Sequence, residues 1–286
     1  MSRPGLILKL SCHDQPGIIA KVANYAAVHS GNVVELNQFS DKLGSKFFAR
    51  FEIETSNLDV ENQDFIDGFG TLGRSLHATW HFRRKPYRMR TAVLVTKTDH
   101  CLNEILWRAG LDELPIEITS IIGNRDNCMA IAENHNLPFH LIEMDGDRKA
   151  DGFAEIRSLI EKQNVELIVL ARFMQIIPTD FCRDYAGRII NIHHSFLPAF
   201  IGANPYRQAY ERGVKLIGAT CHYVTADLDA GPIIEQEVER AHHHHTPSDL
   251  ARLGRNCERI AIAKGIRYHV NDRTIIDGNR AIVFPD

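Results

Sequence analysis

This sequence of 286 residues lacks three features that would assign its class at once: a long apolar run, a paired-cysteine motif and a surplus of basic residues. The apolar stretch before Lys9 is too short for a signal-peptide core, and no later run approaches the length of a membrane span. The net charge of −3 offers no basic surface for nucleic acid or an anionic membrane. We therefore expect a cytoplasmic protein whose partner is a small molecule, with no nucleic acid and no membrane.

Cysteines are few and scattered. No two of the six form a C-x-x-C pair, which argues against a disulfide framework and against a structural zinc site. We expect reduced thiols at all six positions, which are Cys12, Cys101, Cys128, Cys182, Cys221 and Cys257.

Glycine is missing where a nucleotide site would need it. The first strand of the second half of the chain continues into VTKTDHCL (95–102), which contains no glycine. A phosphate cradle needs backbone that turns tightly and approaches the phosphate closely, so glycine-rich loops are typical of it. The sequence thus predicts neither an NAD nor an ATP site, and no cysteine or histidine set with metal-ligand spacing is evident.

What is present is an ordinary globular composition, 44% hydrophobic and 24% charged, in a chain long enough for two domains. Residues 1–84 show alternating and helical apolar patterns in the order β-α-β-β-α-β. This order is typical of the ferredoxin-like fold. In one of its predicted strands, KFFARFEIE (46–54), every second residue from Phe47 to Ile53 falls on one apolar face.

From residue 85 to 286 the pattern changes to strands alternating with helices. The strand-like runs are nearly continuous in apolar and β-branched residues, as in TAVLVT (91–96) and VELIVLA (165–171). We therefore predict an α/β protein whose second domain has a mostly parallel, Rossmann-like sheet with helices on both faces. Ligands of such sheets bind beyond the carboxyl ends of the strands.

One predicted strand, in IINIHHSFLP (189–198), ends in three polar side chains. Because side chains alternate along a strand, Asn191 and His193 should share one side and His194 should point to the other. A later strand places Thr220 and His222 on one face.

The turn after that later strand contains Asp227 and Asp229. An amide, an imidazole and a carboxylate suit acyl chemistry: Asn191 and a protonated His193 could stabilise an oxyanion while Asp229 takes or relays a proton. Each piece also has a structural interpretation, because strand-end histidines and turn aspartates commonly satisfy nearby backbone. No serine or cysteine lies in a nucleophile-elbow context, so attack by water or by an amine substrate is predicted.

The segment NIHHSFLPAFIGANPYRQAYERGVKLIGATCHYVTADLDAGPIIEQ (191–236) resembles the folate-dependent formyltransferase and hydrolase superfamily, whose signature joins N-I-H-x-S-x-L-P to L-D-x-G-P. The resemblance implies that the catalytic residues are Asn191, His193 and Asp229. It also implies a pterin pocket at the end of the ARFMQIIP strand (171–178), whose contacts with the substrate would be largely backbone. The substrate-binding residues expected from motif and strand together are Met174, Gln175, Ile176, Ile177, Thr220, His222 and Asp227.

Within that superfamily the whole chain resembles the formyltetrahydrofolate deformylases. The resemblance implies hydrolysis of 10-formyltetrahydrofolate to formate and tetrahydrofolate, supplying formate for one-carbon and purine metabolism, with the folate as substrate and no other cofactor. The related glycinamide ribonucleotide formyltransferases carry a glycine-rich phosphate loop that VTKTDHCL lacks. Arg207 departs from the histidine expected in deformylases.

The opening segment SCHDQPGIIAKVANYAAVHSGNVVE (11–35) resembles the ACT domain, a regulatory module that typically binds an amino acid. This implies an effector such as glycine or methionine, and we expect the protein to be a homo-oligomer. A domain that only assembles subunits stays open. Two other functions also stay open: a formyltransferase with an unidentified acceptor, and a catalytically silent amino-acid sensor.

Four consecutive histidines, His242 to His245, precede a predicted helix with Thr246 or Ser248 at its cap. Neighbouring side chains point in different directions, so four in a row do not converge on one metal without a bend. We expect an exposed connection there, and a structural β-hairpin in the C-terminal NDRTIIDGNRAIVFPD (271–286).

Overall fold

The computed structural model describes residues 4–198 and 205–286, and its chain divides into two compact units. Unit 1 contains residues 1–87, 272–275 and 282–286, and unit 2 contains residues 88–271 and 276–281. The division between residues 87 and 88 falls three residues after the predicted boundary. The sequence patterns gave no sign that C-terminal segments join unit 1. Segment 199–204 of the signature lies outside the described residues.

Unit 1 is built on a four-stranded antiparallel sheet in the order β2-β3-β1-β4. Apolar side chains of β1 and β3 pack with those of both helices in one core, which includes Phe51, Ile53, Val22 and Phe69. The strand periodicity thus aims one face of the sheet at the helices. The elements are β1 (Gly5–His13), α1 (Ile18–Val28), β2 (Asn32–Asp41), β3 (Lys46–Glu54), α2 (Asn62–Ser75) and β4 (Thr79–Lys85), in the predicted order.

Unit 2 has an α/β fold around a seven-stranded sheet in the order β11-β10-β9-β8-β5-β6-β7. The five strands from β5 to β9 pair in parallel, and β10 runs antiparallel to both of its neighbours. The mostly parallel sheet is confirmed. Its strands are β5 (Met89–Val95), β6 (Ile116–Gly123), β7 (Phe139–Leu141), β8 (Leu167–Leu170), β9 (Ile189–His193), β10 (Leu216–Tyr223) and β11 (Ile233–Arg240).

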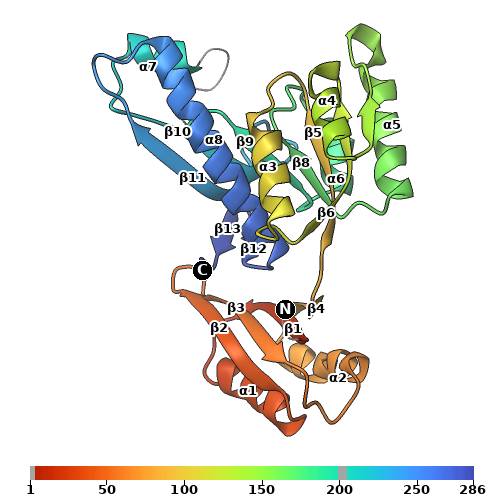
Figure 1. Cartoon of the computed structure of the whole chain (residues 1–286). Helices are drawn as coiled ribbons and strands as arrows, with labels where there is room; N and C mark the ends of the chain where they lie inside the picture. The colour runs from red at the N-terminus through yellow and green to blue at the C-terminus, as the bar shows by residue number, and fades with distance from the viewer. Residues whose placement is uncertain (1–3, 199–204) are drawn as a thin grey trace. The chain divides into compact units, whose positions relative to one another are not determined.

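Helices cover both faces of this sheet (Figure 1). Phe153 and Ile156 of α5 pack on the face that carries Leu94 and Leu170. On the other face α8 comes so close to β10 that a Cβ at Gly265 would lie 2.2 Å from Cys221 Sγ. The helices are α3 (His100–Gly110), α4 (Met129–Asn134), α5 (Lys149–Lys162), α6 (Thr179–Asp184), α7 (Pro205–Glu211) and α8 (Pro247–Val270), with short 3₁₀ turns at Asp126–Cys128 and Gly146–Arg148.

Two smaller predictions also agree with the structure. The C-terminal hairpin is present as β12 (Thr274–Asp277) and β13 (Arg280–Val283). The histidine run forms a largely exposed turn, after which Thr246 caps α8 in a reciprocal pair with Asp249. No helix in the described part of the chain is both long and apolar enough to cross a membrane.

Candidate active site

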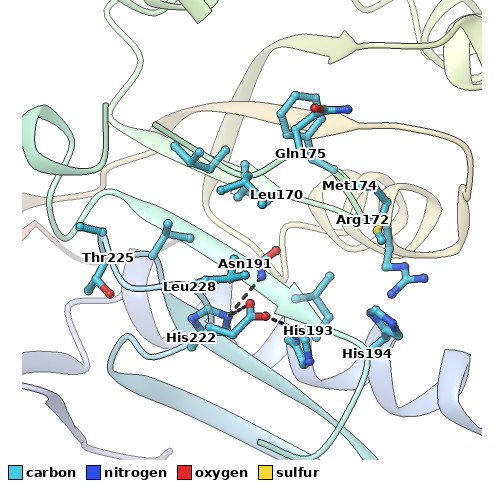
Figure 2. Close-up of a pocket in the computed structure, with 17 residues that line it drawn as sticks. Leu170, Arg172, Met174, Gln175, Asn191, His193, His194, His222, Thr225 and Leu228 are labelled. Atoms are coloured by element: carbon cyan, nitrogen blue, oxygen red, sulfur yellow. Dashed lines mark hydrogen bonds and ion pairs between the residues drawn. The ribbon is translucent and has the colours of Figure 1, made fainter. Parts of the chain in front are cut away.

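A cavity of about 280 Å³ opens on unit 2 where β8 and β9 end (Figure 2). Its lining comes from three places: the segment after β8, the end of β9, and the connection between β10 and β11. The lining residues are Leu170, Arg172–Ile177, Asn191–His194, His222, Val224–Ala226, Leu228 and Asp229.

The register of three neighbouring strands brings the polar groups together. Asn191 of β9 lies beside Leu170 of β8 and opposite His222 of β10. Because Cys221 turns toward α8, its neighbour His222 turns to the opposite face, where the cavity lies. The antiparallel β10 thus adds a second histidine to the one supplied by β9.

Four side chains form a connected polar cluster at the base of the cavity (Figure 2). His193 Nδ1 lies 3.2 Å from Asp229 Oδ2, and His222 Nε2 lies 3.7 Å from Asp229 Oδ1. His222 Nδ1 lies 2.9 Å from the carbonyl of Tyr223 and so donates to it, which leaves Nε2 to accept from Asn191 Nδ2 at 3.2 Å. The sequence predicted Asn191, His193 and Asp229 as catalytic, and the fold brings all three together.

The charges of this cluster are set by its contacts. The hydrogen bond from His193 lowers the pKa of Asp229, against the opposing effect of burial. Burial lowers the pKa of His222. Asp229 is therefore a carboxylate and His222 a neutral imidazole at neutral pH. His193 Nε2 is buried and has no hydrogen-bond partner within 4–198 and 205–286, so it can bind a ligand atom.

The segment after β8 forms the apolar wall of the cavity. Met174, Gln175, Ile176 and Ile177, all predicted to surround a pterin, line it, and the side chains of Met174 and Ile176 are more than half exposed. The hydroxyl of Thr96 accepts a hydrogen bond of 3.0 Å from the backbone N–H of Met174. The wall therefore offers apolar side chains and backbone groups, as a flat heterocycle requires.

Three predicted or suspected residues lie outside the cavity lining. Thr220 is fully buried; its hydroxyl donates to the carbonyl of Ser195 and accepts from the N–H of Leu197, so it holds the segment that follows β9. Asp227 is an exposed turn residue whose carbonyl oxygen accepts from Thr225 Oγ1. Arg207 is 75% exposed and pairs with Glu211 one helical turn away.

Two basic side chains are among the lining residues of the cavity that the sequence patterns did not predict. His194 lines it together with His193, although strand alternation predicted that it would point elsewhere; β9 ends at His193, so the alternation no longer applies. Arg172 also lines it, with a left-handed φ of 64° that no local pattern indicated. Each of these basic side chains closely follows a strand that ends at the cavity, and that position in the sequence could have indicated them.

Across the described ranges, one group of side chains is close enough together to share a metal ion: His100, Cys101 and Glu258. Tyr206 donates to one Glu258 oxygen at 2.8 Å, His100 lies 2.8 Å from the other, and Arg172 approaches to 3.4 Å. Burial raises the pKa of Cys101 well above its ordinary value, so the thiol stays protonated. The carboxylate is occupied and a cation stands beside it, so this group does not fit a metal ion.

Comparison with known proteins first gives the class. Residues 89–266 match the family model described as formyl transferase. A glycinamide ribonucleotide transformylase 1 from Symbiobacterium toebii has a similar crystal structure, with a TM-score of 0.66 and 28% identity over 71% of this chain and 97% of that one. Residues 89–266, which make up most of unit 2, are therefore a formyl transferase domain.

Closer relatives match nearly the whole chain. The formyltetrahydrofolate deformylase of Bacillus subtilis (strain 168) is 42% identical over 97% of this chain and 93% of its own length. The crystal structure of such an enzyme from Pseudomonas syringae pv. tomato has a TM-score of 0.97 and 40% identity, covering 100% of this chain and 96% of that one. The chain belongs to the formyltetrahydrofolate deformylase family, and it is a hydrolase.

Proposed function

We propose that this protein hydrolyses 10-formyltetrahydrofolate to formate and tetrahydrofolate, with the pterin against residues 174–177 and the formyl group above the polar cluster. The observation that carries this assignment is the unpartnered, buried Nε2 of His193, held by Asp229 beside the amide of Asn191. That arrangement offers two donors to one oxygen of a substrate. The family membership independently supports the same substrate.

The reaction follows from these contacts. Water attacks the formyl carbon, and Asp229 accepts its proton directly or through a neighbouring group. His193, when protonated, donates from Nδ1 to Asp229 and from Nε2 to the developing oxyanion, to which Asn191 supplies its second N–H. The C–N10 bond then breaks, N10 takes a proton, and formate leaves.

The decisive experiment incubates the pure protein with 10-formyltetrahydrofolate and a chelator, with and without candidate amine acceptors. We expect formate and tetrahydrofolate to form in equal amounts without an acceptor. A strict requirement for an amine, with negligible hydrolysis, would instead identify a formyltransferase. No turnover under either condition would leave the silent amino-acid sensor as the interpretation.

We further propose that the N-terminal unit is a ferredoxin-like ACT domain that binds glycine or methionine and regulates a cytoplasmic homo-oligomer, within one-carbon and purine metabolism. The β-α-β-β-α-β element order supports this. Calorimetry should use the full chain, because residues 272–275 and 282–286 belong to the same unit. If neither amino acid releases heat or changes turnover, only an assembly role remains, which light scattering would measure.

A further inference from the structure

The cavity wall beside His194 contains an arginine with unused hydrogen-bonding capacity. Arg172 Nε and Nη1 are both buried, and neither has a hydrogen-bond partner in the part of the chain that the structure describes. Glu258 Oε2 lies 3.4 Å from Nε, an ion-pair distance without hydrogen-bond alignment. Buried donors are almost always satisfied in native proteins, so two unsatisfied donors on a side chain that lines a cavity indicate a missing acceptor.

The backbone at this position supports the same conclusion. Arg172 has a φ of 64°, in the left-handed region where a residue with a Cβ is strained and glycine is favoured. A strained non-glycine residue at a cavity is a reason to look for a function of its side chain. The guanidinium points toward His194 (Figure 2).

The groups behind Arg172 hold it in place without satisfying it. Glu258 is 1% exposed; burial alone would raise its pKa, but the hydrogen bond from His100 and the charge of Arg172 outweigh this and lower it. The Tyr206 hydroxyl donates a hydrogen bond to Glu258. It passes close to Gly254, because a Cβ at that glycine would lie 2.0 Å from the hydroxyl oxygen. Glu258 is therefore an anchored anion that orients the guanidinium.

His194 adds a neutral donor to the same wall. Burial, with Arg172 next in importance, lowers the pKa of His194 from its ordinary 6.5 to about 4. At neutral pH its imidazole therefore carries one N–H and no charge. It offers a hydrogen bond to an anion without a second positive charge beside Arg172.

We propose that Arg172 and His194 form an anion subsite that receives the carboxylate of formate when the C–N10 bond breaks. The inference rests on the proposed function and deepens it. Hydrolysis joins water oxygen to the formyl carbon, gives N10 one proton and releases formate with a second proton to solvent. Transfer to an amine would yield a neutral formamide, which lacks the negative charge that a guanidinium pairs with. A fixed cation beside the cluster thus suits the hydrolytic product.

The test measures sodium formate binding to the folate-free protein by proton saturation-transfer NMR, and inhibition of turnover by formate at constant ionic strength. We expect Arg172→Gln to weaken both by about tenfold or more and Arg172→Lys by less, because a lysine keeps the charge but not the paired donors. Arg125→Gln is the matched control, since Arg125 lies outside the cavity lining and pairs with Asp145. Unchanged formate binding in Arg172→Gln would overturn the proposal.

A measurement on the unmodified protein keeps the test decisive if Arg172→Gln does not fold. Formamide matches formate in size but is uncharged, so it should bind at least about tenfold more weakly; equal binding of the two would refute a charge-selective subsite. The two proposals fail separately. Arg172-dependent formate binding without turnover would remove the proposed hydrolysis alone, whereas turnover without detectable formate binding would remove the subsite alone.

Discussion

Two arginines of this protein, one fully buried and one partly buried, have opposite surroundings. Arg50, in the sheet of unit 1, is 2% exposed and donates to Glu35 at 3.0 Å and to Glu52 at 3.1 Å. Arg172, in the cavity wall of unit 2, is 16% exposed and lies 3.4 Å from one carboxylate, and its Nε and Nη1 have no hydrogen-bond partner among the described residues. Burial alone therefore does not separate a structural cation from a functional one. Unsatisfied hydrogen-bond donors distinguish the two arginines, because only a donor without a protein partner gains a hydrogen bond when a ligand binds.

The largest expected effect concerns the polar cluster that Arg172 adjoins. His193→Ala and Asp229→Asn should each lower turnover on the order of 100-fold or more, because an oxyanion donor or the proton acceptor is lost. Turnover is compared with folate affinity and thermal unfolding, which should change little. Arg50→Gln provides the contrast: its folded fraction should keep turnover. Near-normal hydrolysis by either cluster variant would refute the assigned roles.

The two arginines themselves should differ in stability. Arg50→Gln removes a buried cation together with its hydrogen bonds to Glu35 and Glu52. These carboxylates keep Arg273 and Lys85 as partners, so we expect a loss of about 2 kcal/mol in unfolding free energy.

Arg172→Gln breaks no hydrogen bond among the described residues, but it removes a cation from beside Glu258. That carboxylate keeps its hydrogen bonds with His100 and Tyr206, so we expect a loss of about 1 kcal/mol. Urea unfolding of both variants gives the comparison. If Arg172→Gln proved the more destabilising, Arg172 would be a structural residue like Arg50.

His194 tests the electrostatics of the same wall. Its folded-state pKa of about 4 lies below its ordinary 6.5, so its neutral form is favoured in the fold. Above pH 6.5 it therefore contributes no pH dependence, whereas between pH 6.5 and 4 the unfolded chain gains a proton that the fold rejects, and stability falls. Because asparagine does not titrate in this range, the unfolding free energy of His194→Asn should decrease by about 2 kcal/mol less between pH 6.5 and 4 than that of the unmodified protein. This value is smaller than the full pKa shift implies, because the side chain is partly exposed.

The groups around His194 define the measurement. Arg172 and His193 disfavour its charged form, and Glu258 and Asp229 favour it, with burial the largest influence. Urea unfolding at pH 7, 5.5 and 4.5 should show parallel stabilities at the highest pH and divergence below. Identical pH profiles for the variant and the unmodified protein would mean that His194 is protonated as readily in the fold as in the unfolded chain.

The smallest effect is expected at Arg207. This side chain is exposed and pairs with Glu211 on its own helix, so it should contribute little energy. Arg207→His, the residue expected in deformylases, should change turnover by less than about twofold and stability by less than about 0.5 kcal/mol. Steady-state kinetics on the two proteins checks this. A larger change in turnover would show that this helix takes part in catalysis.

The sequence was most informative where the chemistry is local. Alternating or continuous apolar runs predicted the strands, since the period of side chains along a strand is a property of the backbone itself. The same alternation put Asn191 and His193 on one side, and both line the cavity. It failed at His194, one residue beyond the end of β9, because alternation holds only while the strand continues.

By itself, then, the sequence determined the element order, the apolar faces and the residue types that carry the chemistry, all of which depend on neighbours along the chain. The tertiary structure alone decided which of these residues meet. Thr220 was buried under the segment after β9, Asp229 was brought to His193 by the reversal of β10, and Arg172 was turned into the cavity on a strained backbone. The physical reason is that burial and unsatisfied donors are set by atoms distant in sequence, and no local pattern contains them.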